Sequence, residues 1–298
     1  MQPGLYIAAV SGGVDSMVML DVVRQIPGVE LVVAHVDHGV RTDSAEDAKL
    51  VEKFVMSHNL KYEVTTLGLG PDVSEEEARN KRYDVLRHLS KKYNARAILT
   101  AHHKDDIIET AIINMIRGTG WRGLSSLRST GDIIRPFLSF TKAELAQYAE
   151  EHNVPWRHDS TNNDLRYLRN RVRLELLPNE SAEFKEKLYQ YIVRQNELTE
   201  LIDDEAMNWL TDNKLLDSPV ASLPRYELIM MPRNVAHELL QTVLRQKVGK
   251  SITRPLADRA LLFVNVAKPH KTFPIDAKWQ LRALPREVIV EERPLVVS

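Results

Sequence analysis

The 298-residue chain contains no cysteine. This absence excludes disulfide bonds, thiolate metal sites, cysteine-held iron–sulfur clusters and a catalytic thiol. The chain also lacks a run of about eighteen apolar residues, and no charged leader precedes the short apolar stretch near its start. We therefore expect neither a membrane span nor a secretion signal, and the expected location is the cytoplasm.

The chain has little excess charge, because 40 Lys and Arg residues stand against 41 Asp and Glu residues for a formal net charge of -1. This balance argues against nucleic-acid binding through overall charge, but it leaves room for local basic patches. Hydrophobic residues make up 43% of the sequence. A chain of this length and composition can bury a substantial core and is expected to form about two domains.

Short apolar runs in the first part of the chain are typical of strands. They lie at residues 5–10, 31–36, 62–67, 95–101 and 133–137. Most are separated by stretches long enough for a helix. Two capping boxes, Ser74 with Glu77 and Thr141 with Glu144, mark expected helix starts. The alternation predicts an α/β fold with a parallel, doubly wound sheet.

The strand rhythm stops after Leu177-Pro178-Asn179, where long amphipathic segments begin. We expect a sheet domain at residues 1–180, a smaller helical domain at 181–268 and a short terminal hairpin at 269–298.

A glycine-containing hexapeptide lies directly after the first predicted strand and before an apolar helix. Its residues are Ser11, Gly12, Gly13, Val14, Asp15 and Ser16. The glycines allow a tight turn with inward-pointing N–H groups, the serine hydroxyls add donors, and the helix N-terminus adds partial positive charge. We predict that this loop binds a phosphate or pyrophosphate, in preference to being an ordinary strand-to-helix turn.

Polar residues also lie at the end of the second strand and after the fourth, and the carboxyl ends of these strands open onto the ligand crevice of a doubly wound sheet. His35 and Asp37 share a face of the second strand, and we expect both to meet the nucleotide. The group after the fourth strand has helical spacing and comprises His102, Asp105, Asp106 and Glu109. Alone it would suit the metal site of a phosphohydrolase, but beside a phosphate loop we favour a cationic substrate and magnesium.

Arginines are the remaining candidates. Arg117 begins a glycine-containing loop after this helix, and could stabilise the charge of a departing pyrophosphate or simply end the helix. A denser group, suited to RNA phosphates but also to a solvated helix face, comprises Arg166, Arg169, Arg171 and Arg173. Arg82 belongs to a second, weaker basic segment.

The hexapeptide resembles the PP-loop of ATP pyrophosphatases, which cleave ATP between the α and β phosphates and pass AMP to an acceptor oxygen. The resemblance continues through a series of motifs in order. They are AHVDHGVR at 34–41, RNKRY at 79–83, AHHKDD at 101–106, RGTG at 117–120, RPF at 135–137 and the segment 159–173. Over roughly residues 5–178 the chain is similar to tRNA(Ile)-lysidine synthetases.

The resemblance implies an adenine nucleotide α-hydrolase-like fold, with ATP binding and catalysis in residues 1–180 and tRNA binding in 181–268. It further implies that ATP adenylylates the C2 oxygen of the wobble cytidine in the minor isoleucine tRNA, which has a CAU anticodon. L-lysine then displaces AMP to give lysidine. Many family members continue into a further C-terminal domain, so this chain is either a short form or a truncated one.

Under this reading the catalytic residues are Asp37, Asp105, Asp106, Glu109 and Arg117. Mg²⁺ is expected through Asp15 or Asp37, while the roles of lysine anchor, metal ligand and base stay open among the carboxylates. The alternatives are another PP-loop tRNA-modifying enzyme, a metal-dependent phosphohydrolase and a non-catalytic tRNA-binding module. The absence of cysteine disfavours a tRNA thiolase, and a mere binding module would leave the phosphate loop unexplained.

Overall fold

The computed structural model of the chain describes residues 1–37, 44–69, 73, 75–125, 127–158, 165, 168–213, 215, 221–249 and 252–294. The predicted tRNA contact Arg166 and the expected helix start at Ser74 lie outside the described residues, as do motif residues 38–41 and 159–164. The chain divides into two compact units, Met1–Val193 and Arg194–Ser298. No helix in the described part is long and apolar enough to cross a membrane.

The first unit alternates strands and helices. Its strands are β1 (Gly4–Ala9), β2 (Val29–Asp37), β3 (Lys61–Thr66), β4 (Ala97–Leu99) and β5 (Ile133–Ile134). Its helices are α1 (Val14–Arg24), α2 (Ser44–Ser57), α3 (Glu75–Lys92), α4 (Lys104–Ile116), α5 (Trp121–Leu124), α6 (Lys142–Glu151), α7 (Leu168–Arg171) and the first part of α8 (Ala182–Asp212). All strand pairings are parallel, in the order β3-β2-β1-β4-β5. The predicted parallel α/β sheet is confirmed.

The strand order reverses at β1, which pairs with β2 on one side and with β4 on the other. The chain first adds β2 and β3 on one side of β1 and then adds β4 and β5 on the opposite side. Loops that leave the carboxyl ends of the two central strands diverge at such a reversal and open a crevice. The segments after β1 and β4 therefore meet at one edge of the sheet.

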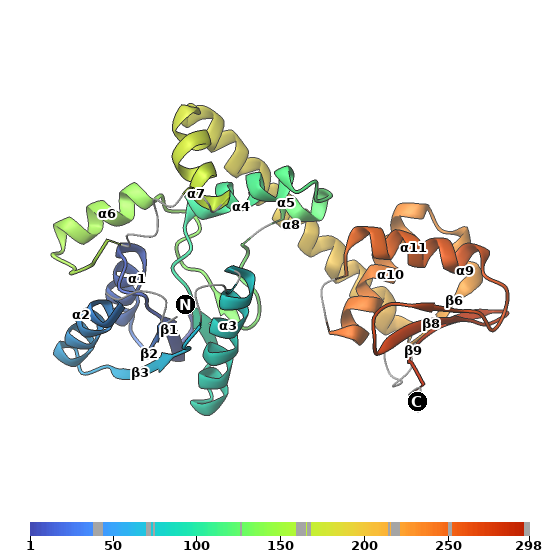
Figure 1. Cartoon of the computed structure of the whole chain (residues 1–298), viewed down its shortest axis with the longest axis horizontal. Helices are drawn as coiled ribbons and strands as arrows, with labels where there is room; N and C mark the ends of the chain where they lie inside the picture. Colours follow the sequence, from blue (N-terminus) through green and yellow to red (C-terminus); the bar gives the residue numbers. More distant parts are fainter. Residues whose placement is uncertain are drawn as a thin grey trace. The chain divides into compact units, whose positions relative to one another are not determined.

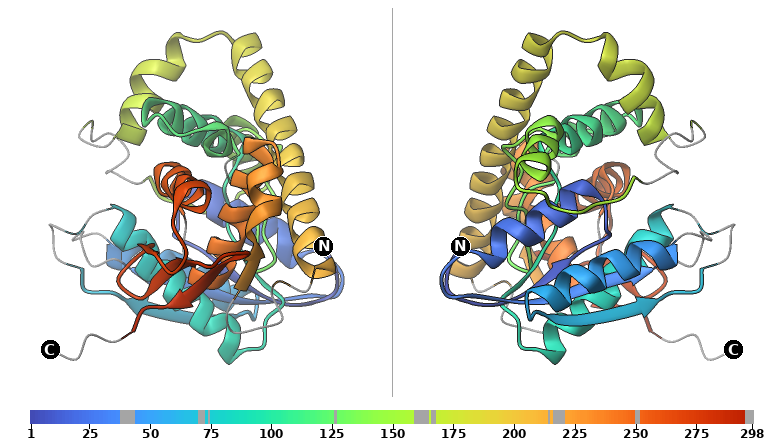
Figure 2. Two further views of the ribbon diagram at one scale, coloured as in Figure 1. Left: turned by 90° about the vertical axis from the view of Figure 1, so that its right-hand side faces the viewer. Right: turned by 90° about the vertical axis from the view of Figure 1, so that its left-hand side faces the viewer.

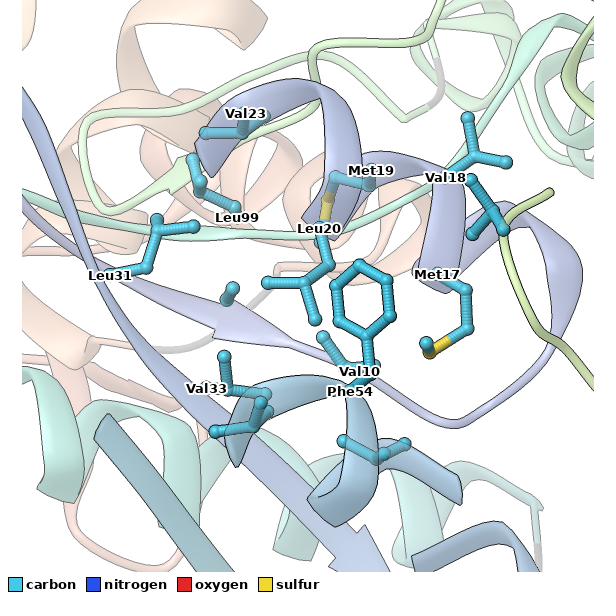
Figure 3. Close-up of a cluster of buried hydrophobic side chains, with 14 of the residues drawn as sticks. Val10, Met17, Val18, Met19, Leu20, Val23, Leu31, Val33, Phe54 and Leu99 are labelled. Carbon is cyan, nitrogen blue, oxygen red and sulfur yellow. The ribbon is translucent and has the colours of Figure 1, made fainter. Parts of the chain in front are cut away.

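Helices cover both faces of this sheet, with α1 and α2 on one side and α3 on the other (Figure 1). Successive strand residues point to opposite faces, so Tyr6 packs with α1, α2 and α6, whereas Ile7 packs with α3. Figure 3 shows the first core, where Leu20 of α1 and Phe54 of α2 gather over Val33. Each large side chain buried in this way contributes about 1.5–3 kcal/mol, so the two cores stabilise the strands that border the crevice.

A further helical layer fixes α4 at the carboxyl edge of the sheet. Ile107 and Ala111 of α4 pack against Ile192 of α8. Ile108 packs against Val172, which belongs to a π-helical turn, η2 (Val172–Leu176), followed by a 3-10 turn, η3 (Leu177–Asn179). Figure 2 shows α4 and the first part of α8 side by side. This packing holds the start of α4 beside the crevice.

The second unit combines helices with a small antiparallel sheet. Its further helices are α9 (Arg225–Met230), α10 (Arg233–Val248) and α11 (Arg254–Val266), and its strands are β6 (Ala221–Pro224), β7 (Thr272–Pro274), β8 (Trp279–Ala283) and β9 (Glu287–Glu292). The sheet order is β6-β9-β8-β7. Leu210, Leu240, Leu261 and Val290 belong to one buried core.

Two features differ from the sequence-based expectation. The chain end supplies three strands instead of a hairpin, and β6 completes their sheet by pairing Ala221 with Val290. With only four residues and a terminal proline, β6 is too short for its alternation to be visible locally. The unit boundary lies inside α8, after Val193 rather than at residue 180, because the first turns of α8 pack on α4.

Candidate active site

The loop between β1 and α1 is folded around the hydroxyl of Ser16. The N–H groups of Ser11 and Gly12 donate to Ser16 Oγ at 3.1 and 3.2 Å, and the hydroxyl donates to the Gly13 carbonyl at 2.9 Å. Gly12 has φ +95°, a conformation that L residues rarely adopt. Gly13 is the N-cap of α1, so the unpaired N–H groups of the first helical turn point back toward this loop.

Arg157, in the segment after α6, holds this loop through hydrogen bonds. Its N–H donates to the Gly12 carbonyl at 3.0 Å, and its guanidinium donates to Asp47 Oδ1 at 3.0 Å. Asp47 is 8% exposed, and its Cβ lies 3.3 Å from where a Cβ on Gly12 would stand. Sequence reasoning missed both residues, and its only signal was the nearness of Arg157 to the motif at 159–173.

Replacing Arg157 by alanine is expected to weaken ATP binding about five- to tenfold, because Asp47 loses the cation that holds it against the phosphate loop. Titration of ATP binding measures the effect. Arg24→Ala is the matched control, since it removes another arginine–aspartate pair, to Asp21 at 2.6 Å, away from the loop. Equal ATP affinity in the two variants would contradict a role for Arg157 in positioning the loop.

A cavity of about 360 Å³ opens at the crevice between β1 and β4. Its polar lining consists of Ser11, Asp15, Ser16, His35, Asp37, Asp47, Arg82, Thr100, His102 and Asp106. The structure therefore brings the phosphate loop, the end of β2 and the start of α4 into one chamber. Arg82, which we predicted to contact tRNA, forms part of the same wall.

His35 is positioned to meet a nucleotide in this cavity. Its side chain is 4% exposed, and Nδ1 lies 2.9 Å from the carbonyl oxygen of Val10. A carbonyl oxygen only accepts, so Nδ1 is the donor, and in this tautomer Nε2 is an acceptor. Nε2 is buried with no hydrogen-bond partner among the described residues. It is thus suited to accept from an adenine amino group or a ribose hydroxyl.

His103, the N-cap of α4, lies among three carboxylates. Its Nε2 is 3.7 Å from Asp15 Oδ2 and 3.5 Å from Asp106 Oδ2, and its Nδ1 is 3.4 Å from Asp105 Oδ2. Burial lowers the pKa of His103, but the surrounding carboxylates outweigh it, so the net shift raises the pKa. His103 thus carries a positive charge to higher pH than a free histidine.

The neighbouring His102 has the opposite character. Burial lowers the pKa of His102 to about 3, and the charges of Arg135, Arg79 and Arg82 act in the same direction. Its Nδ1 lies 2.9 Å from Thr100 Oγ1. The ring is therefore neutral near pH 7 and serves as a hydrogen-bonding group of the cavity rather than as a cation.

The three predicted carboxylates of α4 face different surroundings. Asp106 lines the cavity and accepts a hydrogen bond from the N–H of His103 at 3.0 Å. Asp105 does not line it and instead accepts from the N–H of Lys142 at 2.8 Å. Burial raises the pKa of Asp105, but hydrogen bonds from His103 and Lys142 outweigh this and lower the pKa to about 2. Asp105 thus ties the start of α4 to the start of α6.

Glu109 is 1% exposed and forms a two-point ion pair with Arg173. Arg173 Nε donates to Oε1 at 2.6 Å and its NH2 group donates to Oε2 at 2.8 Å. Arg169 Nε lies 3.6 Å from Glu109 Oε2, and its NH2 group donates to Thr110 Oγ1 at 2.9 Å. Two of the arginines predicted to contact tRNA therefore have partners inside the first unit.

Two other predicted arginines are exposed. Arg171 lies in α7 with its side chain at the surface, unlike Arg169 and Arg173. Arg117 is the C-cap of α4, eleven positions after Asp106 and hence about 16 Å further along the helix axis. The structure does not bring Arg117 into the cavity that holds the phosphate loop.

The cavity offers oxygen ligands of the kind that Mg²⁺ prefers. Asp15 Oδ1 is buried with no hydrogen-bond partner in the described part of the chain, and Asp37 and Asp106 also line the cavity. Burial raises the pKa of Asp15, and a cation bound beside it would favour its charged form. Mg²⁺ is commonly held by one or two carboxylates together with substrate phosphates, and this donor set fits it. Within the described residues, no group of three or more His, Asp or Glu side chains is arranged to hold a metal.

The fold and the loop are those of PP-loop proteins. Residues 2–180 match the family model described as the PP-loop domain. The chain also shares its fold with a U34-tRNA thiolase from Methanococcus maripaludis that carries a [4Fe-4S] cluster. The TM-score is 0.56 and the identity 18%, over 66% of this chain and 74% of that one.

Comparison with relatives of known name identifies the family within the PP-loop proteins. The tRNA(Ile)-lysidine synthase of Nostoc sp. is 32% identical over 85% of this chain and 78% of its own length. That of Thermotoga maritima is 37% identical over 58% of this chain and 44% of its own length. The chain belongs to the tRNA(Ile)-lysidine synthase family. It spans about half the length of several of these relatives, including 54% of the Mesoplasma florum protein.

Proposed function

We propose that this chain uses ATP to convert a cytidine of tRNA into lysidine. The observation that carries the proposal is the single cavity shared by the phosphate loop, His35 and Asp106, in a chain of the tRNA(Ile)-lysidine synthase family. One chamber can therefore bring a nucleotide, a base and a cationic amine together. The substrates follow as ATP, L-lysine and tRNA(Ile) with a CAU anticodon.

The first step is transfer of AMP to the base. The cytidine C2 oxygen attacks the α phosphorus of ATP, and the bond to the bridging oxygen breaks to release pyrophosphate. The loop around Ser16 and the N-terminus of α1 would hold the departing pyrophosphate, while His35 Nε2 accepts a hydrogen bond from the nucleoside. Mg²⁺ held by Asp15 and Asp37 would neutralise phosphate charge.

In the second step the lysine ε-amine attacks C2 of the activated base, and the bond from C2 to the adenylylated oxygen breaks to release AMP. The amine has a solution pKa of about 10.4, so it arrives as an ammonium ion and must pass a proton to water or to another carboxylate of the site before it attacks. Burial raises the pKa of Asp106, but the charge of His103 and the hydrogen bond from its N–H outweigh burial and lower the pKa. A carboxylate of low pKa is a weak base, so Asp106 is suited to hold the ammonium group.

The direct test incubates the chain with ATP, labelled L-lysine and a tRNA(Ile) transcript, and then analyses nucleosides and adenine products. We expect lysidine, AMP and pyrophosphate in equal amounts. Asp106→Asn is expected to lower lysine incorporation about 100-fold, because the site loses the charge that holds the ammonium group. Asp84→Asn, which changes an exposed carboxylate of α3, is the control.

Phosphate release without tRNA would reject the proposal and support a phosphohydrolase. Modification of tRNA without lysine would instead favour another PP-loop enzyme. Sulfur transfer through a cysteine-held cluster or a cysteine persulfide is disfavoured already, since the chain has no cysteine. Full incorporation by the Asp106→Asn variant would leave the reaction in place but remove Asp106 as the lysine anchor.

A further inference from the structure

Three arginines gather on the side of the crevice formed by α3 and the end of β5. Arg79 and Arg82 lie in the first half of α3, with their guanidinium carbons 5.1 and 5.6 Å from the centre of the Tyr83 ring. Arg135 follows β5 directly and is 9% exposed. We call Arg79, Arg82 and Arg135 the arginine cluster.

The buried donors of this cluster are incompletely satisfied. Arg82 Nε and Arg135 Nε are both buried with no hydrogen-bond partner among the described residues. One further group of Arg135 donates to the carbonyl of Arg128. Arg87 provides the contrast, because it stacks on the same Tyr83 ring at 5.8 Å but is exposed and donates to Asp132 at 3.0 Å. The cluster thus holds guanidinium groups that lack the kind of partner that Arg87 has.

The electrostatics of the cluster agree with this geometry. None of the three arginines forms an ion pair with a described residue. Burial lowers the pKa of Arg82, and the charges of Arg79 and Arg169 add to the shift. Buried like charges without a counter-ion are costly, and such an arrangement is stabilised when an anion binds.

We propose that the arginine cluster is a phosphate subsite, which binds a backbone phosphodiester of the RNA next to the base that enters the cavity. This inference rests on the proposed function for the choice of RNA as the substrate. Arginine forks bind phosphate in a two-point manner and position the backbone without reading its sequence. A base that is splayed into a pocket leaves its flanking phosphate at the rim, where such a subsite is needed.

The position of the cluster separates it from the phosphates of ATP. The phosphate loop follows β1, whereas Arg135 follows β5, and β4 lies between these strands. Two strand spacings correspond to about 9.5 Å across the sheet. Arg82 lines the cavity, but Arg79 and Arg135 do not. The cluster therefore extends from the wall of the cavity away from the loop that holds the pyrophosphate.

Arg79→Gln and Arg82→Gln test the subsite, with Arg87→Gln as the matched control on the same helix and the same aromatic ring. We expect each test variant to bind tRNA about tenfold more weakly. The slope of log affinity against log salt concentration is expected to become smaller by about one unit, because one phosphate contact is lost. Affinity for ATP is expected to stay within about twofold of the parent in Arg79→Gln, whose side chain does not line the cavity, and Arg87→Gln is expected to change neither affinity. Arg135→Gln is compared only if its thermal stability matches the parent.

Each other outcome overturns the inference in a recognisable way. Loss of ATP affinity with unchanged tRNA binding would assign the cluster to the nucleotide. Unchanged binding of both ligands in Arg79→Gln and Arg82→Gln would make the cluster structural, as would equal losses in Arg87→Gln. Because the experiment measures binding and not lysine transfer, failure of the proposed reaction leaves this result readable. If tRNA binding depends on these arginines but no lysidine is formed, the proposed reaction is rejected and the phosphate subsite is retained.

Discussion

Replacing Ser16 by alanine is expected to lower ATP-dependent turnover at least about 100-fold. The Ser16 hydroxyl receives the N–H groups of Ser11 and Gly12 and donates to the carbonyl of Gly13, so it determines the shape of the whole loop. Without it, those N–H groups lose their acceptor and the loop loses the contacts that fix its shape. Ser16 is 6% exposed, and leaving its partners unpaired is expected to cost about 1–3 kcal/mol of folding stability.

The matched control is Ser57→Ala, which also removes a helical serine hydroxyl, one that donates to the Phe54 carbonyl at 2.8 Å. Turnover with saturating ATP, together with the melting temperature, separates loss of catalysis from loss of folding. Ser57→Ala is expected to retain parental turnover. A folded Ser16→Ala protein with turnover within about tenfold of the parent would reject the phosphate-loop assignment.

Local patterns in the sequence predict the central part of the site because its residues follow strands. The alternation of strands and helices implies a parallel sheet, and polar residues at the carboxyl ends of β1, β2 and β4 must then meet at one edge. The loop at Ser11–Ser16, His35 and Asp106 do line one cavity. The same rule does not distinguish Asp105 from Asp106, because the direction of a side chain at a helix start depends on the capping geometry.

Most of the site features that the sequence does not predict are pairs of residues that lie far apart in the sequence. Glu109 and Arg173 are 64 positions apart, and Arg157 and Asp47 are 110 apart. No periodicity links such positions, since each pairing arises only after the helices have packed. An arginine-rich segment such as 166–173 therefore reads as a surface for RNA even where some of its side chains turn inward. Strand β6 was not predicted for a related reason, because its partner β9 lies far along the sequence, near the end of the chain.

The second large expected effect concerns the buried ion pair of Glu109 and Arg173. Arg173→Met is expected to remove about 3–5 kcal/mol of folding stability, because Glu109 would keep a buried charge with only Arg169 nearby at 3.6 Å. For a domain of this size, a loss of about 3 kcal/mol lowers the melting temperature by roughly 6–12 °C. Arg171→Ala, on the exposed side of the same helical segment, is expected to leave the melting temperature unchanged.

A double variant separates a structural pair from an RNA contact. Glu109→Gln combined with Arg173→Met removes both charges, so it is expected to recover part of the stability that Arg173→Met alone loses. If Arg173 acts through Glu109, tRNA affinity measured on folded protein falls less in Arg173→Met than in Arg171→Ala. Additive stability losses in the double variant would show that the two residues act separately. If Arg173→Met binds tRNA more weakly but keeps the parental melting temperature, Arg173 contacts RNA, as the sequence predicted.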